Sequence, residues 1–247
     1  MRKGLLFLPV LLAVFLLTGC GNAGGELEKT NIPQESIVSV YVESEEGSIQ
    51  IEPGKGKTIQ IEASYAIEAG TKDRREQIAG YGGENILVTT DTSNPSVLTV
   101  LSRLSSDVTL RDGESVQIHL RILVPEGIGS VAIQSDSADI TIANMFGCAY
   151  SIVNNSGSIT VKDSTITGKS SFTNIVGDVE MKLKKVDTAE EIRVSTDVGD
   201  IRFNCPKRTP YTATIEELSQ RGYTLTNKTG GPQISLSTKV GSIKFQK

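Results

Sequence analysis

The chain has 247 residues, a formal net charge of −4, no tryptophan, 5% aromatic residues and 24 glycines. This charge balance argues against a nucleic-acid-binding protein, because such a protein needs a basic face. The single histidine, His119, limits the catalytic and metal-binding chemistry that the chain can offer. The length suits one elongated all-β domain or two small ones.

The first residues have the features of an export signal. Two basic residues at positions 2 and 3 precede an apolar stretch at 5–17, which is too short to cross a bilayer and has the size of a signal-peptide core. The residues Leu17-Thr18-Gly19-Cys20 that follow resemble the lipobox of bacterial lipoproteins. This resemblance implies cleavage before Cys20, lipid on its sulfur and stable anchoring by two acyl chains. An ordinary secretory signal with an incidental cysteine is the alternative.

The domain organisation follows from this leader. We expect residues 1–19 to be the signal peptide and residues 20–35 to be the lipidated cysteine followed by a polar, glycine-rich, flexible spacer. A β-strand-repeat domain then spans 36–247. Loss of the two leader cations would take the net charge from −4 to −6. Residue 21 is not aspartate, so an outer-membrane location is open if the host has two membranes.

The region 36–130 is expected to be rich in antiparallel pairing. Its alternating segments are 57–66, 86–90, 97–101 and 115–124. Asn94-Pro95 and Asp112-Gly113 are turn dipeptides suited to hairpins. The charged run 72–77 (KDRREQ) is expected to be a solvated loop.

The region 131–247 repeats regularly, at about 20 residues, and one further copy of the repeat lies earlier in the chain. Six segments align on a small pivot residue at a turn, and these pivots are Gly47, Ala138, Gly157, Gly177, Gly199 and Gly241. Glycine suits a tight turn that needs a positive φ. The last two pivots are 42 residues apart, and we expect this interval to hold one further, irregular turn around Arg221-Gly222.

Each column of the repeat has a physical meaning. The residues five before the pivot, and two and four after it, are apolar, as in strands that bury one face. The residues three before it share the inward parity but are small and polar, which indicates a stacked hydroxyl or amide ladder. This polar ladder is Ser44, Ser135, Asn154, Asn174, Thr196 and Thr238. A single unit cannot be stable alone, so we predict that the units stack into a β-solenoid or flattened β-roll. An up-and-down sandwich is the alternative.

Segments such as IVNNSGSITVK and VSTDVGDIRFN, with the closing GGPQISLSTKVGSIKFQK, resemble the bacterial β-strand-repeat domains known as putative adhesins, a family of unknown function. The resemblance covers residues 37–247. It implies an extracytoplasmic protein with a β-solenoid-like fold, no known catalytic residues and no cofactor.

The acidic residues after the pivots are the best candidates for chemistry. Asp139, Asp178 and Asp200 occupy one column, and two of them in adjacent rungs would lie about 5 Å apart with a repulsion of about 1 kcal/mol in water. We expect them to accept local turn hydrogen bonds; a calcium site or a catalytic carboxylate pair is the alternative. His119 is expected to be an ordinary strand residue, because a zinc site would need further Cys or His ligands.

Two other groups of residues carry weaker signals. Lys182, Lys184 and Lys185 are expected to form a solvated face, with contact to anionic lipid or wall polymer as the alternative. Cys148 and Cys205 should lie about 14 Å apart along the stack, beyond the ~7 Å that a disulfide allows, so we expect two buried thiols.

These features favour a membrane-anchored, extracytoplasmic lipoprotein that is not an enzyme. We expect an adhesin-like, scaffold or sensing module whose partners are the membrane, through lipid on Cys20, and another envelope protein or a wall polymer. We expect no catalytic residue, metal, cofactor or nucleic acid. The alternative is a β-helix protein that binds or cleaves carbohydrate, which the absence of tryptophan platforms disfavours.

Overall fold

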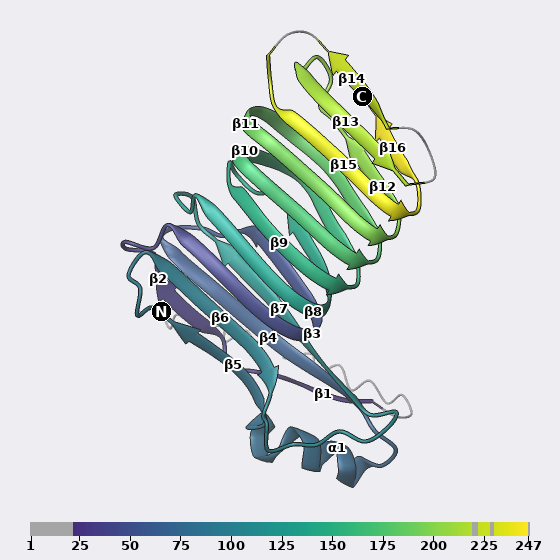
Figure 1. Cartoon of the computed structure of the whole chain (residues 1–247). Helices are drawn as coiled ribbons and strands as arrows, with labels where there is room; N and C mark the ends of the chain where they lie inside the picture. Colours follow the sequence, from purple (N-terminus) through teal and green to yellow (C-terminus); the bar gives the residue numbers. More distant parts are fainter. Residues whose placement is uncertain (1–21, 219–221, 228–229, 247) are drawn as a thin grey trace, which may run out of the picture.

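The structure is a computed structural model that describes residues 22–218, 222–227 and 230–246 (Figure 1). Within these residues it is all-β apart from one α-helix and one short 3-10 helix. The elements in chain order are β1 (Asn22–Glu26), β2 (Thr30–Pro33), β3 (Ser39–Pro53), β4 (Thr58–Glu68), α1 (Lys72–Ala79), η1 (Tyr81–Gly83), β5 (Ile86–Asp91), β6 (Val97–Leu104), β7 (Ser115–Val124), β8 (Ser130–Ala143), β9 (Ala149–Ser156), β10 (Ile159–Val176), β11 (Val179–Val198), β12 (Ile201–Asn204), β13 (Tyr211–Glu217), β14 (Tyr223–Asn227), β15 (Gln233–Val240) and β16 (Ile243–Gln246).

The regular repeats coil as parallel rungs of a flattened solenoid. The first half of β8 pairs with β9, and its second half pairs with the start of β10. β11 pairs with β10 along most of its length. On its other edge, the start of β11 pairs with β12, and the end of β11 pairs with β15. We call the segments before the pivots the first layer and those after them the second layer (Figure 1). The predicted β-solenoid is therefore confirmed, and the up-and-down sandwich is excluded.

The core lies between the two layers and consists of the predicted apolar columns. The residues two after the pivots are all buried: Ile49, Ile140, Ile159, Val179, Ile201 and Ile243. Burial of each such side chain contributes about 1.5–3 kcal/mol relative to its exposure. The alternation of apolar and polar residues, carried from rung to rung, thus holds the stack together.

The pivots need glycine for two reasons. Gly157, Gly177 and Gly241 have φ values of +106°, +133° and +149°. A Cβ on Gly177 would also overlap the carbonyl oxygen of Gly157, the pivot of the preceding rung. Ala138 lies inside strand β8 and does not have a positive φ, so this pivot can carry a side chain.

The polar ladder is buried, and from Asn154 onward it closes the turns. The side chains of Asn154 and Asn174 donate to the carbonyl oxygens of Ala138 and Gly157, at 2.9 and 2.8 Å. Thr196 repeats this contact one rung later, donating to the preceding pivot at 3.0 Å. These small polar residues at an inward position bond the carbonyls that the tight turns leave inside, whereas the buried hydroxyls of Ser44 and Ser135 have no hydrogen-bond partner among the described residues.

The N-terminal region mixes both kinds of pairing. β4 is antiparallel to β7, and β5 is antiparallel to β6, as expected. β3, however, pairs in parallel with β6, β7 and β8, and so forms the first full rung. Asn94-Pro95 lies in the β5–β6 hairpin turn, whereas Asp112-Gly113 precedes β7, which pairs with β3 and β4 and not with β6.

The run 72–77, expected to be a loop, lies in helix α1, so that prediction is wrong. Thr71 caps the helix, because its side chain accepts a hydrogen bond from the backbone N–H of Arg74 at 3.2 Å. Ile78 is fully buried, and the Arg74 guanidinium pairs with Glu114 at 2.8 Å. One cap, one apolar anchor and one ion pair therefore fix a helix that has no amphipathic stripe.

The expected flexible spacer also differs from the structure. β1 and β2 lie within it, and both pair antiparallel with β4. Glycine allows this close packing, because a Cβ on Gly24 would lie 2.6 Å from the carbonyl oxygen of Tyr65. The composition that suggested flexibility thus permits a strand to lie against a tyrosine. Cys20 and the signal segment 1–19 lie outside the described residues.

The sequence predicts an irregular turn around Arg221-Gly222 in the interval between the last pivots, and Arg221 lies outside the described residues. Between β12 and β15 the described residues form the antiparallel pair β13–β14, and β13 lies outside β15 in the first layer. β15 pairs directly with β11, so the last rung stacks on the rung of Gly199. At this end the Glu217 carboxylate accepts a hydrogen bond from the backbone N–H of Ile243 at 2.6 Å. In the earlier rungs the equivalent N–H donates to a carbonyl oxygen of the next rung.

Two further expectations concern the cysteines and the membrane. Cys148 and Cys205 are both buried, and no disulfide joins them. Burial raises the pKa of the Cys148 thiol to about 11, and this thiol donates to the carbonyl of Ile128 at 3.0 Å. No helix in the described part of the chain is long and apolar enough to cross a membrane.

Candidate functional site

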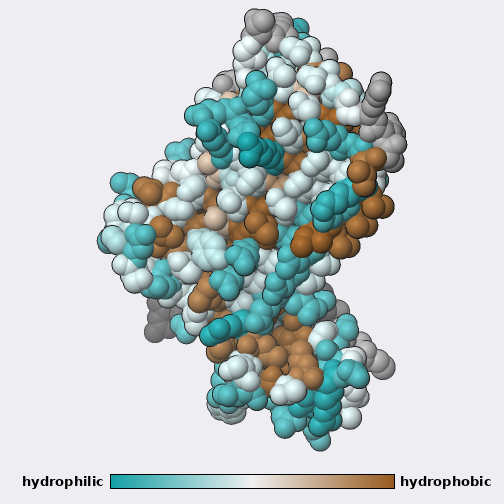
Figure 2. Space-filling model, in the orientation of Figure 1, coloured by the Kyte–Doolittle hydropathy of each residue, from teal (hydrophilic) through white to brown (hydrophobic). Residues whose placement is uncertain are grey.

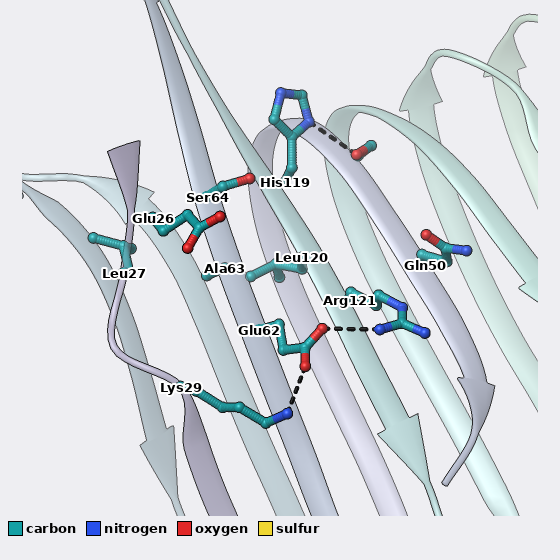
Figure 3. A pocket seen from close by; sticks show the side chains of 11 residues that line it. Glu26, Leu27, Lys29, Gln50, Glu62, Ala63, Ser64, His119, Leu120 and Arg121 are labelled. Carbon is teal, nitrogen blue, oxygen red and sulfur yellow. Dashed lines mark hydrogen bonds and ion pairs between the residues drawn. The ribbon is translucent and has the colours of Figure 1, made fainter. Parts of the chain in front are cut away.

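The candidate site is a hollow of about 530 Å³ on the outward face of the second layer, at its N-terminal end (Figure 3). Strands β3, β4 and β7 form its floor, and β1 with the chain after it forms one wall. Its residues come from segments far apart in the sequence. The register of these strands, rather than any local motif, therefore creates the site.

A row of polar side chains crosses the floor of the hollow. Glu26 lies opposite Ser64, Ser64 opposite His119, and His119 opposite Ser48 in the register of the four strands. The Ser48 hydroxyl lies 2.9 Å from Nδ1 of His119. Ser48 in turn pairs with Asp139, where the row enters the regular rungs.

The row continues along the second layer as the predicted aspartate column. Oδ1 of Asp139 accepts the backbone N–H and the hydroxyl of Ser158, at 2.8 and 2.7 Å. Asp178 accepts the N–H of Asp200 at 2.8 Å, and Asp200 accepts the N–H of Ser242 at 2.9 Å. The backbone N–H of Ser242, followed by its hydroxyl, lowers the pKa of Asp200. These carboxylates thus tie the turns at Ala138, Gly177 and Gly199 to the rung that follows each of them.

A chain of ion pairs forms the lower wall of the hollow (Figure 3). Glu62 binds Nζ of Lys29 at 2.6 Å and Nη1 of Arg121 at 2.9 Å. Arg121 also binds Glu52 through Nη2, at 2.7 Å. The hydrogen bond from Lys29, followed by that from Arg121, lowers the pKa of Glu62. The charges neutralise one another and fix the orientation of the wall.

The polar groups on the floor of the hollow are arranged around the imidazole of His119. A serine–histidine relay needs a carboxylate on the second ring nitrogen, and in the described chain the one hydrogen bond of the His119 ring is to Ser48. No group of three or more His, Cys, Asp and Glu side chains that could hold a metal ion occurs among the described residues. What the hollow offers is uncommitted polar groups, Glu26 and Ser64, beside His119.

The remaining candidates lie apart from this hollow. Lys182 pairs with Asp163 at 3.2 Å, and Lys184 and Lys185 are exposed, as a solvated face requires. The ion-pair wall was missed by sequence reasoning because it depends on strand register. The signal that could have found it is Arg121, the one charged residue of strand β7 and an outward one.

Comparisons with known proteins identify the fold. The family model described as Toastrack DUF4097 matches residues 29–246. A putative cell adhesion protein from Clostridium sporogenes is similar in structure, with a TM-score of 0.55, 9% identity and coverage of 91% of this chain and 99% of that one. A putative adhesin from Bacteroides fragilis has a TM-score of 0.41 and 13% identity, covering 88% and 96%. No curated protein matches the chain.

Proposed function

Since the chain belongs to the Toastrack DUF4097 family, whose function is unknown, we propose that it is a non-enzymatic, adhesin-like binding module of the bacterial cell envelope. Its binding surface is the outward face of the second layer, centred on the hollow at His119. A continuous sheet, antiparallel between β4 and β7 and parallel from β7 onward, holds this face rigid, which suits recognition of a partner without rearrangement.

One observation carries this proposal: the uninterrupted outward polar row from Glu26 to Ser242. Its carboxylates are ordered by hydrogen bonds to the next rung, so the row is preorganised rather than mobile. Preorganised polar groups lose little entropy on binding. Such a face fits another envelope protein or an extended wall polymer.

The lipobox supports the second part of the proposal, which is that the module is exported and tethered to a membrane by lipid on Cys20. Replacement of Cys20 by alanine should release the protein from the membrane fraction. A mature, cleaved variant that remains in the membrane fraction would contradict the tether.

The binding surface is tested by photo-crosslinking in intact cells. A crosslinking amino acid at Gln50, in the hollow, should capture a partner, whereas the same group at Ser171, outward on the first layer, should not. Mass spectrometry and sugar analysis of the product then separate a protein partner from a wall polymer. Equal capture at both positions would show that this face is not the binding surface.

A further inference from the structure

The start of β1 limits how far the folded chain can stand from a lipid anchor. If the mature protein begins at Cys20, as we propose, only Cys20 and Gly21 precede the first residue of β1. Two residues of extended chain span about 7 Å. β1 is paired with β4 along its length, so it cannot unwind to lengthen the tether without breaking the sheet.

The neighbours of this point form one end of the molecule. Asn22, the first residue of β1, pairs with Glu68, and α1 begins four residues after Glu68, so the start of β1 and the helix share this end (Figure 1). η1 follows α1 and lies against the other end of β1, because a Cβ on Gly83 would lie 3.3 Å from the side chain of Tyr65, which pairs with Gly25. β1, α1 and η1 therefore line one end of the molecule.

This surface presents an aromatic side chain to solvent. Tyr81, in η1, is 93% exposed, the highest exposure among the large hydrophobic residues of the described chain. Figure 2 shows an apolar patch beside α1 at this end of the molecule. A tyrosine with an apolar body and a polar tip favours the interface between lipid and water.

The cations of α1 are all engaged. Lys72 pairs with Glu76 at 3.4 Å, the Arg74 guanidinium is held by Glu114, and the Arg75 guanidinium donates to the carbonyl oxygen of Ala69 at 2.9 Å. The exposed carboxylates of Asp73 and Glu84 disfavour anionic headgroups, so this surface suits zwitterionic lipid.

We propose that the end formed by β1, α1 and η1 is the membrane-facing surface of the protein, with Tyr81 in the lipid interface. This inference rests on the proposed tether. It places the C-terminal hairpin β13–β14 at the end remote from the bilayer (Figure 1). The second-layer hollow then lies close to the membrane, and the later rungs extend away from it.

The absence of tryptophan from the chain allows a direct test. Residues 20–247 are coupled through Cys20 to a maleimide lipid in phosphatidylcholine vesicles, so that the outcome does not depend on lipidation in cells. The buried Cys148, with its raised pKa, and the buried Cys205 should not compete for the maleimide.

Two single-tryptophan variants are compared, Tyr81→Trp and, at the remote end, Leu218→Trp, a position that is 80% exposed. Lipids brominated on their acyl chains should quench the tryptophan at 81 severalfold more than the one at 218. Equal quenching at both positions, or stronger quenching at 218, would overturn the proposed orientation. Failure of the tether itself would appear only in the cell fractionation of Cys20→Ala.

Discussion

Replacement of Gly177 by alanine perturbs the stacking of two rungs with a single methyl group. The residue has a φ of +133°, and the added Cβ would overlap the Gly157 carbonyl. A side chain in such a sparsely populated backbone region costs about 1–3 kcal/mol. Separation of these two rungs also weakens the hydrogen bonds from the Gly157 N–H to the Val176 carbonyl, at 3.0 Å, and from Asn174 to the Gly157 carbonyl, at 2.8 Å, each worth about 0.5–1.5 kcal/mol. The free energy of unfolding should therefore fall by about 2–6 kcal/mol.

Gly168 provides the matched control. Its φ is +56°, but no atom lies within 4 Å of the Cβ that alanine would add. Gly168→Ala should therefore cost only the backbone term, about 1–2 kcal/mol. Urea unfolding of both variants, followed by circular dichroism, separates the two contributions, and a 4 kcal/mol loss would lower Tm by about 8–16 °C. If Gly177→Ala costs no more than Gly168→Ala, the pivots do not need glycine for stacking.

Three further predictions test the core, the acid response and the end of the stack. Ile201→Asp should cost more than about 4 kcal/mol because it buries an unpaired charge, whereas Arg202→Asp should be mild; equal changes in Tm would mean that the inward column is misassigned. Hydrogen bonds from Arg74 hold the pKa of Glu114 at about 2, below its ordinary 4.5, so its stabilisation is present above pH 4.5 and is lost as the pH falls to 2. Glu114→Gln should flatten the acid-unfolding curve in that window, and an unchanged curve would contradict this role. Glu217→Ala should promote self-association, because it frees the backbone N–H of Ile243 at the edge of the last rung, whereas Glu216→Ala should not. Equal light scattering by the two variants would show that Glu217 does not protect this edge.

The rungs could be predicted because the residues that define each of them lie within a few positions of one another in the sequence. An apolar residue two after each pivot, a small polar residue three before it and glycine between them recur in one short window. Parallel stacking then follows, since identical columns bury one another only when the rungs are in register. The hydrogen bonds of Asn154 and Asn174 to the pivot carbonyls explain why polar residues occupy an inward column.

The elements that were missed depend on contacts between distant residues. α1 lacks an amphipathic pattern, and its Arg74 finds Glu114 forty residues away. β1 is glycine-rich and becomes a strand only because β4 supplies Tyr65 and an open edge. The β13–β14 hairpin lies outside a strand that follows it in the chain. Local periodicity contains none of this information.

The candidate site was found only in part for the same reason. His119 and Asp139 stood out by residue type, but their places in one row follow from the pairing of β7, β3 and β8. The ion pairs of Lys29 and Arg121 with Glu62 join the connection between β1 and β2 to strands β4 and β7, and no spacing in the sequence predicts them.

The intact mass of the protein extracted from native membranes decides whether the proposed tether exists. We expect a mature chain that begins at Cys20 and carries a thioether-linked diacylglycerol, with the mass of the lipid confined to the N-terminal peptide. A mature chain that begins at another residue, or one whose N-terminal peptide has no lipid, would contradict both the tether and the proposed orientation of the solenoid on the membrane.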